Sequence, residues 1–151
     1  MPTTLEPGDK APAFSGASSD DTTISLRDFR GKRNLVLYFY PMDNSPGCTR
    51  EARAFRDAAA RFDELGTAIV GVSTQSVESH KRFVANNELP FPLVSDRDKA
   101  ISGAYGVLKE NGKNAERSTF LIDSKGTIRA VWPEVSITGH ADEIVKAIEK
   151  M

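Results

Sequence analysis

Residues 36–62, VLYFYPMDNSPGCTREARAFRDAAARF, join a short apolar run to a long segment with the apolar spacing of a helix. The apolar run stops at Pro41, and a polar, turn-prone segment leads from there to Ser45. Ser45 suits the N-cap of a helix, and Pro46 suits the first helical position because its missing N–H leaves nothing unpaired there. The stretch therefore predicts a buried strand followed by a helix whose first turn holds Cys48.

A thiol in that first turn is a candidate nucleophile. An ordinary thiol has a pKa of roughly 8.5, so only a few per cent of it is thiolate at neutral pH. Ionising most of it near neutrality needs a downward shift of about two units, or roughly 2.7 kcal/mol. A helix N-terminus supplies about 0.3–1 kcal/mol, and up to roughly 2 kcal/mol in a partly buried site. The helix alone falls short, so we expect a cation, most simply an arginine, from elsewhere in the chain.

Length and charge limit the classes of protein to consider. The 151 residues predict a single domain, residues 1–151, that is large enough to bury its own core. The formal net charge is -1 with both signs interspersed, which gives no basic patch for nucleic acid. No apolar run approaches the roughly 20 residues of a membrane span, and the N-terminal sequence lacks the features of a signal peptide. We therefore expect a cytoplasmic protein without a nucleic-acid or membrane partner.

The sequence contains one cysteine and two histidines, His80 and His140. One cysteine can form neither an internal disulfide nor a CxxC redox pair, and the two histidines do not give the usual zinc spacings. No metal site and no cofactor are expected. A lone cysteine of an intracellular protein is more often inert and buried than catalytic. It is the placement of Cys48 after a strand, at a helix start, that favours catalysis.

The regions around the opening stretch predict how the sheet is built. Residues 34–40 lack polar alternation, which indicates a central strand covered on both faces. Gly66 ends the helix and residues 67–73 repeat the strand pattern, so strand, helix and strand predict a parallel crossover. Residues 14–26 predict a hairpin with its turn at 18–22, followed by a helical turn over 26–32.

The rest of the chain completes an α/β fold. Further helices are expected at residues 76–87, 96–105 and 141–151, and further strands at 91–94, 117–123 and 127–133. The last two strands are joined by a tight hairpin at residues 124–126. This order predicts a thioredoxin-like arrangement, a central mixed sheet flanked by helices, with an N-terminal hairpin extension.

Three segments carry a resemblance to a known family: YFYPMDNSPGCTREARAFRD at residues 38–57, FPLVSD at 91–96 and ERSTFLID at 116–123. They resemble the peroxiredoxins, and within them the branch named for bacterioferritin comigratory protein, or peroxiredoxin Q. The similarity extends over nearly the whole chain. Its most specific motif is proline, three residues, Thr or Ser, two residues and cysteine, which falls here on Pro41, Ser45 and Cys48.

The resemblance implies a peroxidase in which Cys48 is the peroxidatic cysteine, whose thiolate attacks a peroxide oxygen and becomes a sulfenic acid. The family's active-site arginine falls on Arg117, which would be the missing cation. Ser45 would hydrogen-bond the peroxide or the thiolate, and Pro41 would shield the site from water. The free N–H groups of Gly47 and Cys48 would bind the peroxide.

Each of these residues also has a structural alternative. Cys48 could be a small buried apolar residue, and Arg117 a solvated charge at a strand end. Pro41 could simply end the strand, and Ser45 could act only as the N-cap, a position where the family more often has threonine.

Other residues are weaker candidates. Glu51 could orient an arginine, but an exposed acid that complements the helix dipole is the favoured interpretation. His80 and His140 are expected to be capping or surface residues. Trp132, Phe39 and Phe120 are expected in the core.

The chain departs from many members of the resembled branch because it lacks a resolving cysteine. The two positions where such a cysteine is found correspond here to Arg53 and to about Val84. The resemblance with this departure predicts a one-cysteine cycle that reduces hydrogen peroxide and alkyl hydroperoxides. An external thiol, such as thioredoxin, glutaredoxin or a small thiol, would regenerate the protein, and the branch implies a monomer. The alternative is a redox-sensing or thiol–disulfide exchange protein of the same fold.

Overall fold

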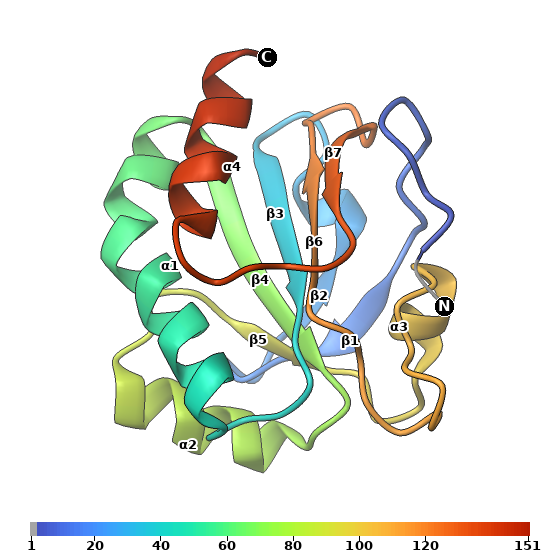
Figure 1. Ribbon diagram of the computed structural model, residues 1–151, viewed down its shortest axis with the longest axis vertical. Coiled ribbons are helices and arrows are strands. Elements are labelled where there is room, and N and C mark those ends of the chain that lie inside the picture. The colour runs from blue at the N-terminus through green and yellow to red at the C-terminus, as the bar shows by residue number, and fades with distance from the viewer. Residues whose placement is uncertain (1–2) are drawn as a thin grey trace.

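The computed structural model describes residues 3–151 and centres on a five-stranded mixed sheet in the order β5-β4-β3-β6-β7 (Figure 1). The strands are β3 (Asn34–Phe39), β4 (Thr67–Ser73), β5 (Leu93–Ser95), β6 (Ser118–Ile122) and β7 (Ile128–Trp132). Strands β3, β4 and β5 run parallel, whereas β6 is antiparallel to both β3 and β7. The strand predicted to be central is the middle strand of the sheet.

Helices cover both faces of the sheet. Helices α1 (Pro46–Glu64), α2 (Val77–Asn87) and α4 (His140–Glu149) pack on one face. Helix α3 (Ala100–Ala104) and the predicted hairpin of β1 (Ser15–Ala17) and β2 (Thr23–Ser25) cover the other, with a 3-10 turn at Leu26–Asp28. Figure 1 shows α1 and α4 on one side of the sheet, with α3 and the hairpin on the opposite side. The three layers and the hairpin extension agree with the predicted architecture.

Strand β3 supplies side chains to two cores. Leu35, Leu37 and Phe39 lie in the core beneath the hairpin and α3. Val36 and Tyr38 lie in the core beneath α1, α2 and α4. Side chains alternate between the two faces of a strand, so a strand without polar positions has to be covered on both. The central place of β3 follows from its sequence for this reason.

The predicted core aromatics lie at different depths. Phe39 and Phe120 are fully buried, as predicted, and their rings meet edge to face. Trp132 is partly exposed and packs against the rim of the core beneath α1 and α4.

Two predicted elements are shorter than expected. The helix expected over residues 96–105 spans only Ala100–Ala104, because the Asp96 carboxylate accepts hydrogen bonds from the N–H groups of Ile101 and Ser102 at 3.0 and 2.7 Å. The residues before α3 therefore form a capping loop. The strand expected from residue 91 begins at Leu93, because Pro92 has no N–H to give to a neighbouring strand.

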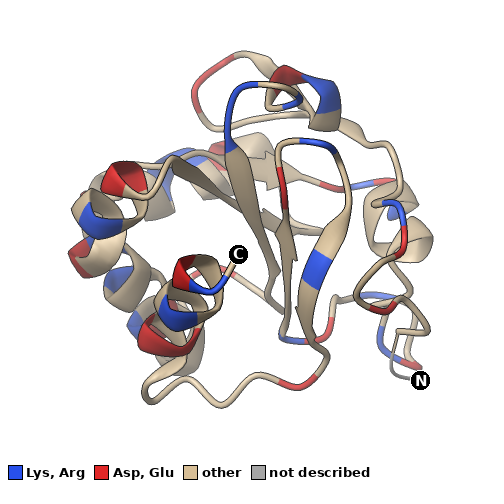
Figure 2. Ribbon diagram, turned by 90° about the horizontal axis from the view of Figure 1, so that it is seen from above, with Lys and Arg blue, Asp and Glu red and all other residues tan. Residues whose placement is uncertain are grey.

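Charged residues of both signs are interspersed along the helices, and the strands of the central sheet carry few (Figure 2). Within the described part of the chain, no helix combines the length and the apolar character that a bilayer crossing needs.

Candidate active site

Cys48 is the third residue of α1, which follows the central strand β3 in the chain. The N-cap is Ser45, whose hydroxyl oxygen accepts a hydrogen bond from the Cys48 N–H at 3.2 Å. The cysteine is 1% exposed and belongs to the core beneath α1. The helix start predicted from Ser45 and Pro46 is confirmed, and it places the sulfur near the partial positive charge of the first turn.

Arg117 is the residue just before β6, the strand next to β3, and reaches the sulfur from there. Strand β6 pairs with β3 so that Ser118 lies opposite Phe39, which puts Arg117 beside the end of β3. Arg117 Nη2 donates to Cys48 Sγ at 3.3 Å. Burial alone would lower the pKa of Arg117, but Glu51 and Cys48 beside it outweigh burial and raise that pKa. The guanidinium stays charged, and the structure brings together the cysteine and the cation expected from the sequence.

Glu51 is not the exposed acid that the sequence analysis favoured. It is 2% exposed, and its Oε1 accepts from Arg117 Nη1 at 2.8 Å. Its Oε2 has no hydrogen-bond partner among the described residues. Burial raises the pKa of Glu51 to about 7, against the opposing effect of Arg117. The sequence held a signal for this: residues three apart share a helix face, and Cys48 lies on the buried face of α1.

The two terminal nitrogens of one guanidinium therefore bind two different groups of α1. Nη1 binds the Glu51 carboxylate and Nη2 faces the Cys48 sulfur. Two contacts from a planar fork fix its orientation as well as its position.

Gly47 makes room for this guanidinium. A Cβ at Gly47 would lie 3.2 Å from Arg117 Nη2, so a larger residue would crowd the arginine. The N–H of Cys48, expected to be free for a peroxide, already donates to Ser45. The N–H of Gly47, at the second helical position, has no acceptor within the helix.

Pro41 and Ser45 lie at the two ends of the loop between β3 and α1. Pro41 is half-buried, and its carbonyl oxygen accepts from Asn114 Nδ2 at 3.1 Å. The Ser45 hydroxyl is 3.5 Å from the Met42 carbonyl oxygen, a long hydrogen bond. Its proton is therefore easily redirected toward a bound ligand.

His80 and His140 are not capping or surface residues, because both side chains are buried. His140 opens α4, and its ring nitrogens lie 2.9 Å from Thr119 Oγ1 and 3.2 Å from Glu143 Oε1. Burial lowers the pKa of His140 despite the opposing effect of Glu143. His80 lies in α2 and contacts Asp43. Thr119 and Asp43 are distant in the chain from His140 and His80, which is why helical spacing gave no sign of burial.

Asp43 is a buried residue of this region that the sequence analysis did not single out. It is 6% exposed, although it lies in a short polar loop that favours exposure. The only sequence feature that pointed to a role for Asp43 was its place between Pro41 and Ser45.

The arrangement suits a sulfur nucleophile that attacks a small electrophile. The guanidinium stabilises negative charge on the sulfur and offers N–H donors to an oxygen that gains charge in the reaction. The Gly47 N–H and the Ser45 hydroxyl are further donors at the N-terminus of α1.

Comparisons with known proteins agree with this chemistry. The profile of the AhpC/TSA family matches residues 7–131. The chain is 42% identical over 154 residues to the peroxiredoxin Bcp of Bacillus subtilis, with 98% of each chain covered. The crystal structure of peroxidoxin BcpB from Mycobacterium tuberculosis has a TM-score of 0.90 at 31% identity, covering 97% of this chain and 98% of that one.

A third similar protein is the bacterioferritin comigratory protein of Xanthomonas campestris. Its structure has a TM-score of 0.86 at 37% identity and covers 98% of each chain. It is described in terms of its alkyl peroxide reduction activity and a trapped intermediate or ligand complex. These matches confirm the expected thioredoxin-like fold.

Proposed function

This chain is a peroxiredoxin of the Bcp/PrxQ branch of the AhpC/TSA family, and we propose that Cys48 is its peroxidatic cysteine and Arg117 its activating cation. The observation that carries the proposal is the 3.3 Å contact between Arg117 Nη2 and Cys48 Sγ in the first turn of α1. Hydrogen peroxide and alkyl hydroperoxides are the proposed substrates. The alkyl peroxide activity described for the Xanthomonas campestris protein supports the second class.

In the first step the Cys48 thiolate attacks one peroxide oxygen. An S–O bond forms as the O–O bond breaks, the sulfur is oxidised to a sulfenic acid, and the second oxygen leaves with the electron pair and takes a proton as water or an alcohol. Arg117 stabilises the thiolate and donates to the peroxide. The Gly47 N–H and the Ser45 hydroxyl hold the peroxide oxygens, and Pro41 limits access of water.

Regeneration then requires two thiols from outside the chain. The sequence contains no cysteine besides Cys48, and the resolving positions carry Arg53 and Val84. A first thiol attacks the sulfenic sulfur and releases water, giving a mixed disulfide. A second thiol attacks the mixed disulfide, which returns Cys48 as a thiolate and releases an oxidised disulfide. Thioredoxin, glutaredoxin or a small thiol can act in this way.

The proposed working form is a monomer. A disulfide between the Cys48 residues of two chains would have to bring together two sulfurs that are each almost fully buried, since Cys48 is 1% exposed. Size measurement by analytical ultracentrifugation, before and after peroxide treatment, checks this directly.

The rate of Cys48 oxidation tests the proposed function. In a competition assay against horseradish peroxidase, Arg117→Ala is expected to slow the reaction of Cys48 with peroxide by about 100-fold or more, the effect of removing a charged donor from a transition state. Arg129→Ala is a matched control, because Arg129 forms its ion pair with Asp123 on the hairpin of β6 and β7. Slow oxidation that is insensitive to Arg117 contradicts the proposal.

Turnover separates this enzyme from a redox sensor. With a thiol in excess, the wild-type protein is expected to consume peroxide continuously and Cys48→Ser to consume none. A single stoichiometric oxidation favours the sensor instead. Comparing dithiothreitol, glutathione with glutaredoxin, and thioredoxin with its reductase then identifies the class of reductant.

A further inference from the structure

The loop between β3 and α1, residues 41–45, needs support from outside itself. It has no regular secondary structure, and Asn44 has a φ of 67°, in the left-handed region that non-glycine residues seldom adopt. The loop leads directly into Ser45 and Cys48. Whatever fixes this loop also fixes the sulfur relative to Arg117, which arrives from a different strand.

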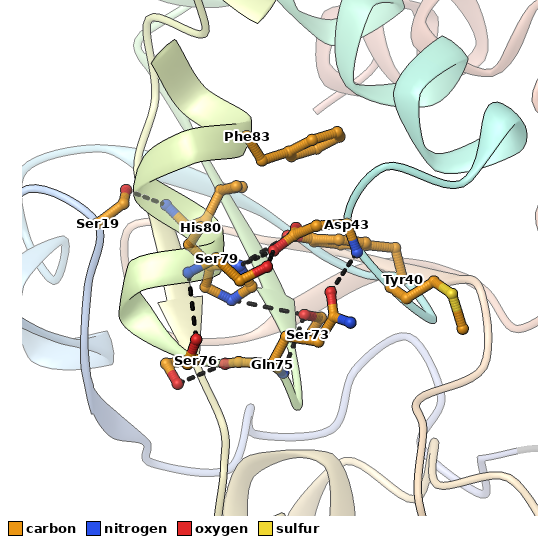
Figure 3. A network of polar contacts seen from close by, with 12 residues as sticks. Ser19, Tyr40, Asp43, Ser73, Gln75, Ser76, Ser79, His80 and Phe83 are labelled. Carbon is orange, nitrogen blue, oxygen red and sulfur yellow. Dashed lines mark hydrogen bonds and ion pairs between the residues drawn. The ribbon is translucent and has the colours of Figure 1, made fainter. Parts of the chain in front are cut away.

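The Asp43 side chain ties the loop to α2 (Figure 3). Its Oδ1 accepts from the Tyr40 hydroxyl at 2.7 Å. Its Oδ2 accepts from the Ser79 hydroxyl at 2.7 Å and lies 2.7 Å from Nδ1 of His80. The Asp43 backbone N–H donates to the side-chain oxygen of Gln75. Asp43, in the middle of the loop, is thus held by four polar contacts.

Both ring nitrogens of His80 face hydrogen-bond acceptors. Nδ1 faces the Asp43 carboxylate and Nε2 faces the Val94 carbonyl oxygen at 3.1 Å. A carbonyl can only accept, so Nε2 carries a proton. Burial alone would raise the pKa of Asp43, but hydrogen bonds from His80, Tyr40 and Ser79 and the charge of His80 outweigh it and lower that pKa. Asp43 is therefore ionised, and the His80 ring bridges its carboxylate to the Val94 carbonyl oxygen.

A fully buried polar pair of this kind is a poor device for stability alone. The His80 side chain is 0% exposed and that of Asp43 is 1% exposed, so both groups have lost their water. The desolvation cost of such pairs often matches or exceeds their attraction, and apolar replacements can be as stable. Fixed geometry is the better explanation, because this pair joins the loop to α2 and, through Val94, to β5.

We propose that Asp43 and His80 are positioning residues of the peroxidase, which hold the loop of residues 41–45 so that Cys48 and Ser45 meet Arg117 in reactive geometry. The proposal rests on the function proposed for Cys48. Neither residue touches the sulfur or the peroxide; both act through the loop.

Two substitutions at Asp43 separate the effect of its hydrogen-bond network from the effect of its carboxylate charge. Asparagine can rebuild the network, since its Oδ1 accepts from Tyr40 while its Nδ2 donates to Ser79 and to a neutral His80. Alanine removes every side-chain contact. Asp43→Ala is expected to slow Cys48 oxidation by about tenfold or more, and Asp43→Asn by no more than about threefold, because small misplacements of reacting groups cost large factors in rate.

Asp96→Ala is the matched control. Asp96 is as buried as Asp43 but holds the start of α3. All variants are compared at a temperature where circular dichroism shows them folded. Wild-type speed in Asp43→Ala, an equal slowing in Asp96→Ala, or an equal slowing in Asp43→Asn each overturns the positioning role. If Asp43→Ala does not fold, the double variant Gln75→Ala with Ser79→Ala decides instead, with the same loss expected.

A spectroscopic signature tests the contact between Asp43 and His80 independently of rate. Proton NMR of the His80 ring is expected to show a hydrogen-bonded Nδ1–H in the wild type and to lose this signal in Asp43→Ala. Absence of the signal in the wild type overturns the contact. Measuring the wild type and Arg117→Ala in parallel separates a failure of this inference from a failure of the proposed function. Fast, arginine-dependent oxidation with no effect of Asp43→Ala rejects only this inference, whereas slow wild-type oxidation rejects the proposed function and with it the inference.

Discussion

The Glu51 carboxyl group is buried beside the guanidinium of Arg117, which contacts the Cys48 sulfur. Its Oε2 has no partner among the described residues, and burial raises its pKa from 4.5 to about 7 although Arg117 lies 2.8 Å away. The group therefore changes charge near neutral pH while Arg117 stays cationic.

Glu51→Gln is expected to change how stability depends on pH. A carboxyl whose pKa is raised on folding stabilises the folded state at low pH, and this contribution is lost as pH rises from 4.5 to about 7. The change corresponds to about 3 kcal/mol. The stability of the wild type relative to Glu51→Gln should therefore fall across this range and level off above it, as measured by urea unfolding at a series of pH values.

Glu64→Gln removes an exposed acid of the same helix and serves as the control for that series. A pH profile that is the same for the wild type and Glu51→Gln contradicts the assignment of a perturbed carboxyl at Glu51.

At the scale of elements, local signals in the sequence predicted the order and type of the strands and helices, but not the bounds of α3 and β5 or the burial of charged residues. Strand β3 and the start of α1 are encoded within a few residues, by unbroken apolar character and by Ser45 and Pro46. Asp43 and His80 are 37 positions apart, so their mutual contact exists only after the sheet and α2 have packed. A polar residue with no local sign of a partner is assigned to the surface by default. This explains why the burial of Glu51, His80 and His140 was not predicted.

Strand β4 tolerates only glycine at position 71. A Cβ there would lie 2.7 Å from Leu93 Cδ2 and 2.8 Å from Tyr38 Cζ, on the two neighbouring strands. Gly71→Ala is expected to cost about 1–3 kcal/mol, the usual penalty for overpacking a core. Gly103→Ala, within α3, is the control of opposite sign. A Cβ at Gly103 would lie 3.9 Å from the nearest atom, Leu108 Cδ1, and alanine favours a helix over glycine by roughly 1 kcal/mol. Thermal unfolding measures both, and equal effects contradict this packing argument.

At the scale of the whole molecule, the site is assembled by long-range contacts. Cys48 and Arg117 are 69 positions apart, and their meeting depends on the pairing of β3 with β6. The family resemblance pointed to both residues, but the geometry between them depends on a sheet buried between two cores. The reactivity of Cys48 is therefore expected to depend on the global fold, in contrast to the intrinsic reactivity of a helix N-terminus.

This dependence predicts the behaviour of the protein in urea. The fast oxidation of Cys48 and the circular dichroism signal should disappear in one transition with the same midpoint, because unfolding separates Arg117 from the sulfur as it disrupts the sheet. Beyond the transition Cys48 should react as slowly as a small free thiol measured in the same urea. Loss of fast oxidation well before the global transition would show that the loop of residues 41–45 opens locally. Fast oxidation that persists in the unfolded chain would show that the guanidinium is not the source of reactivity.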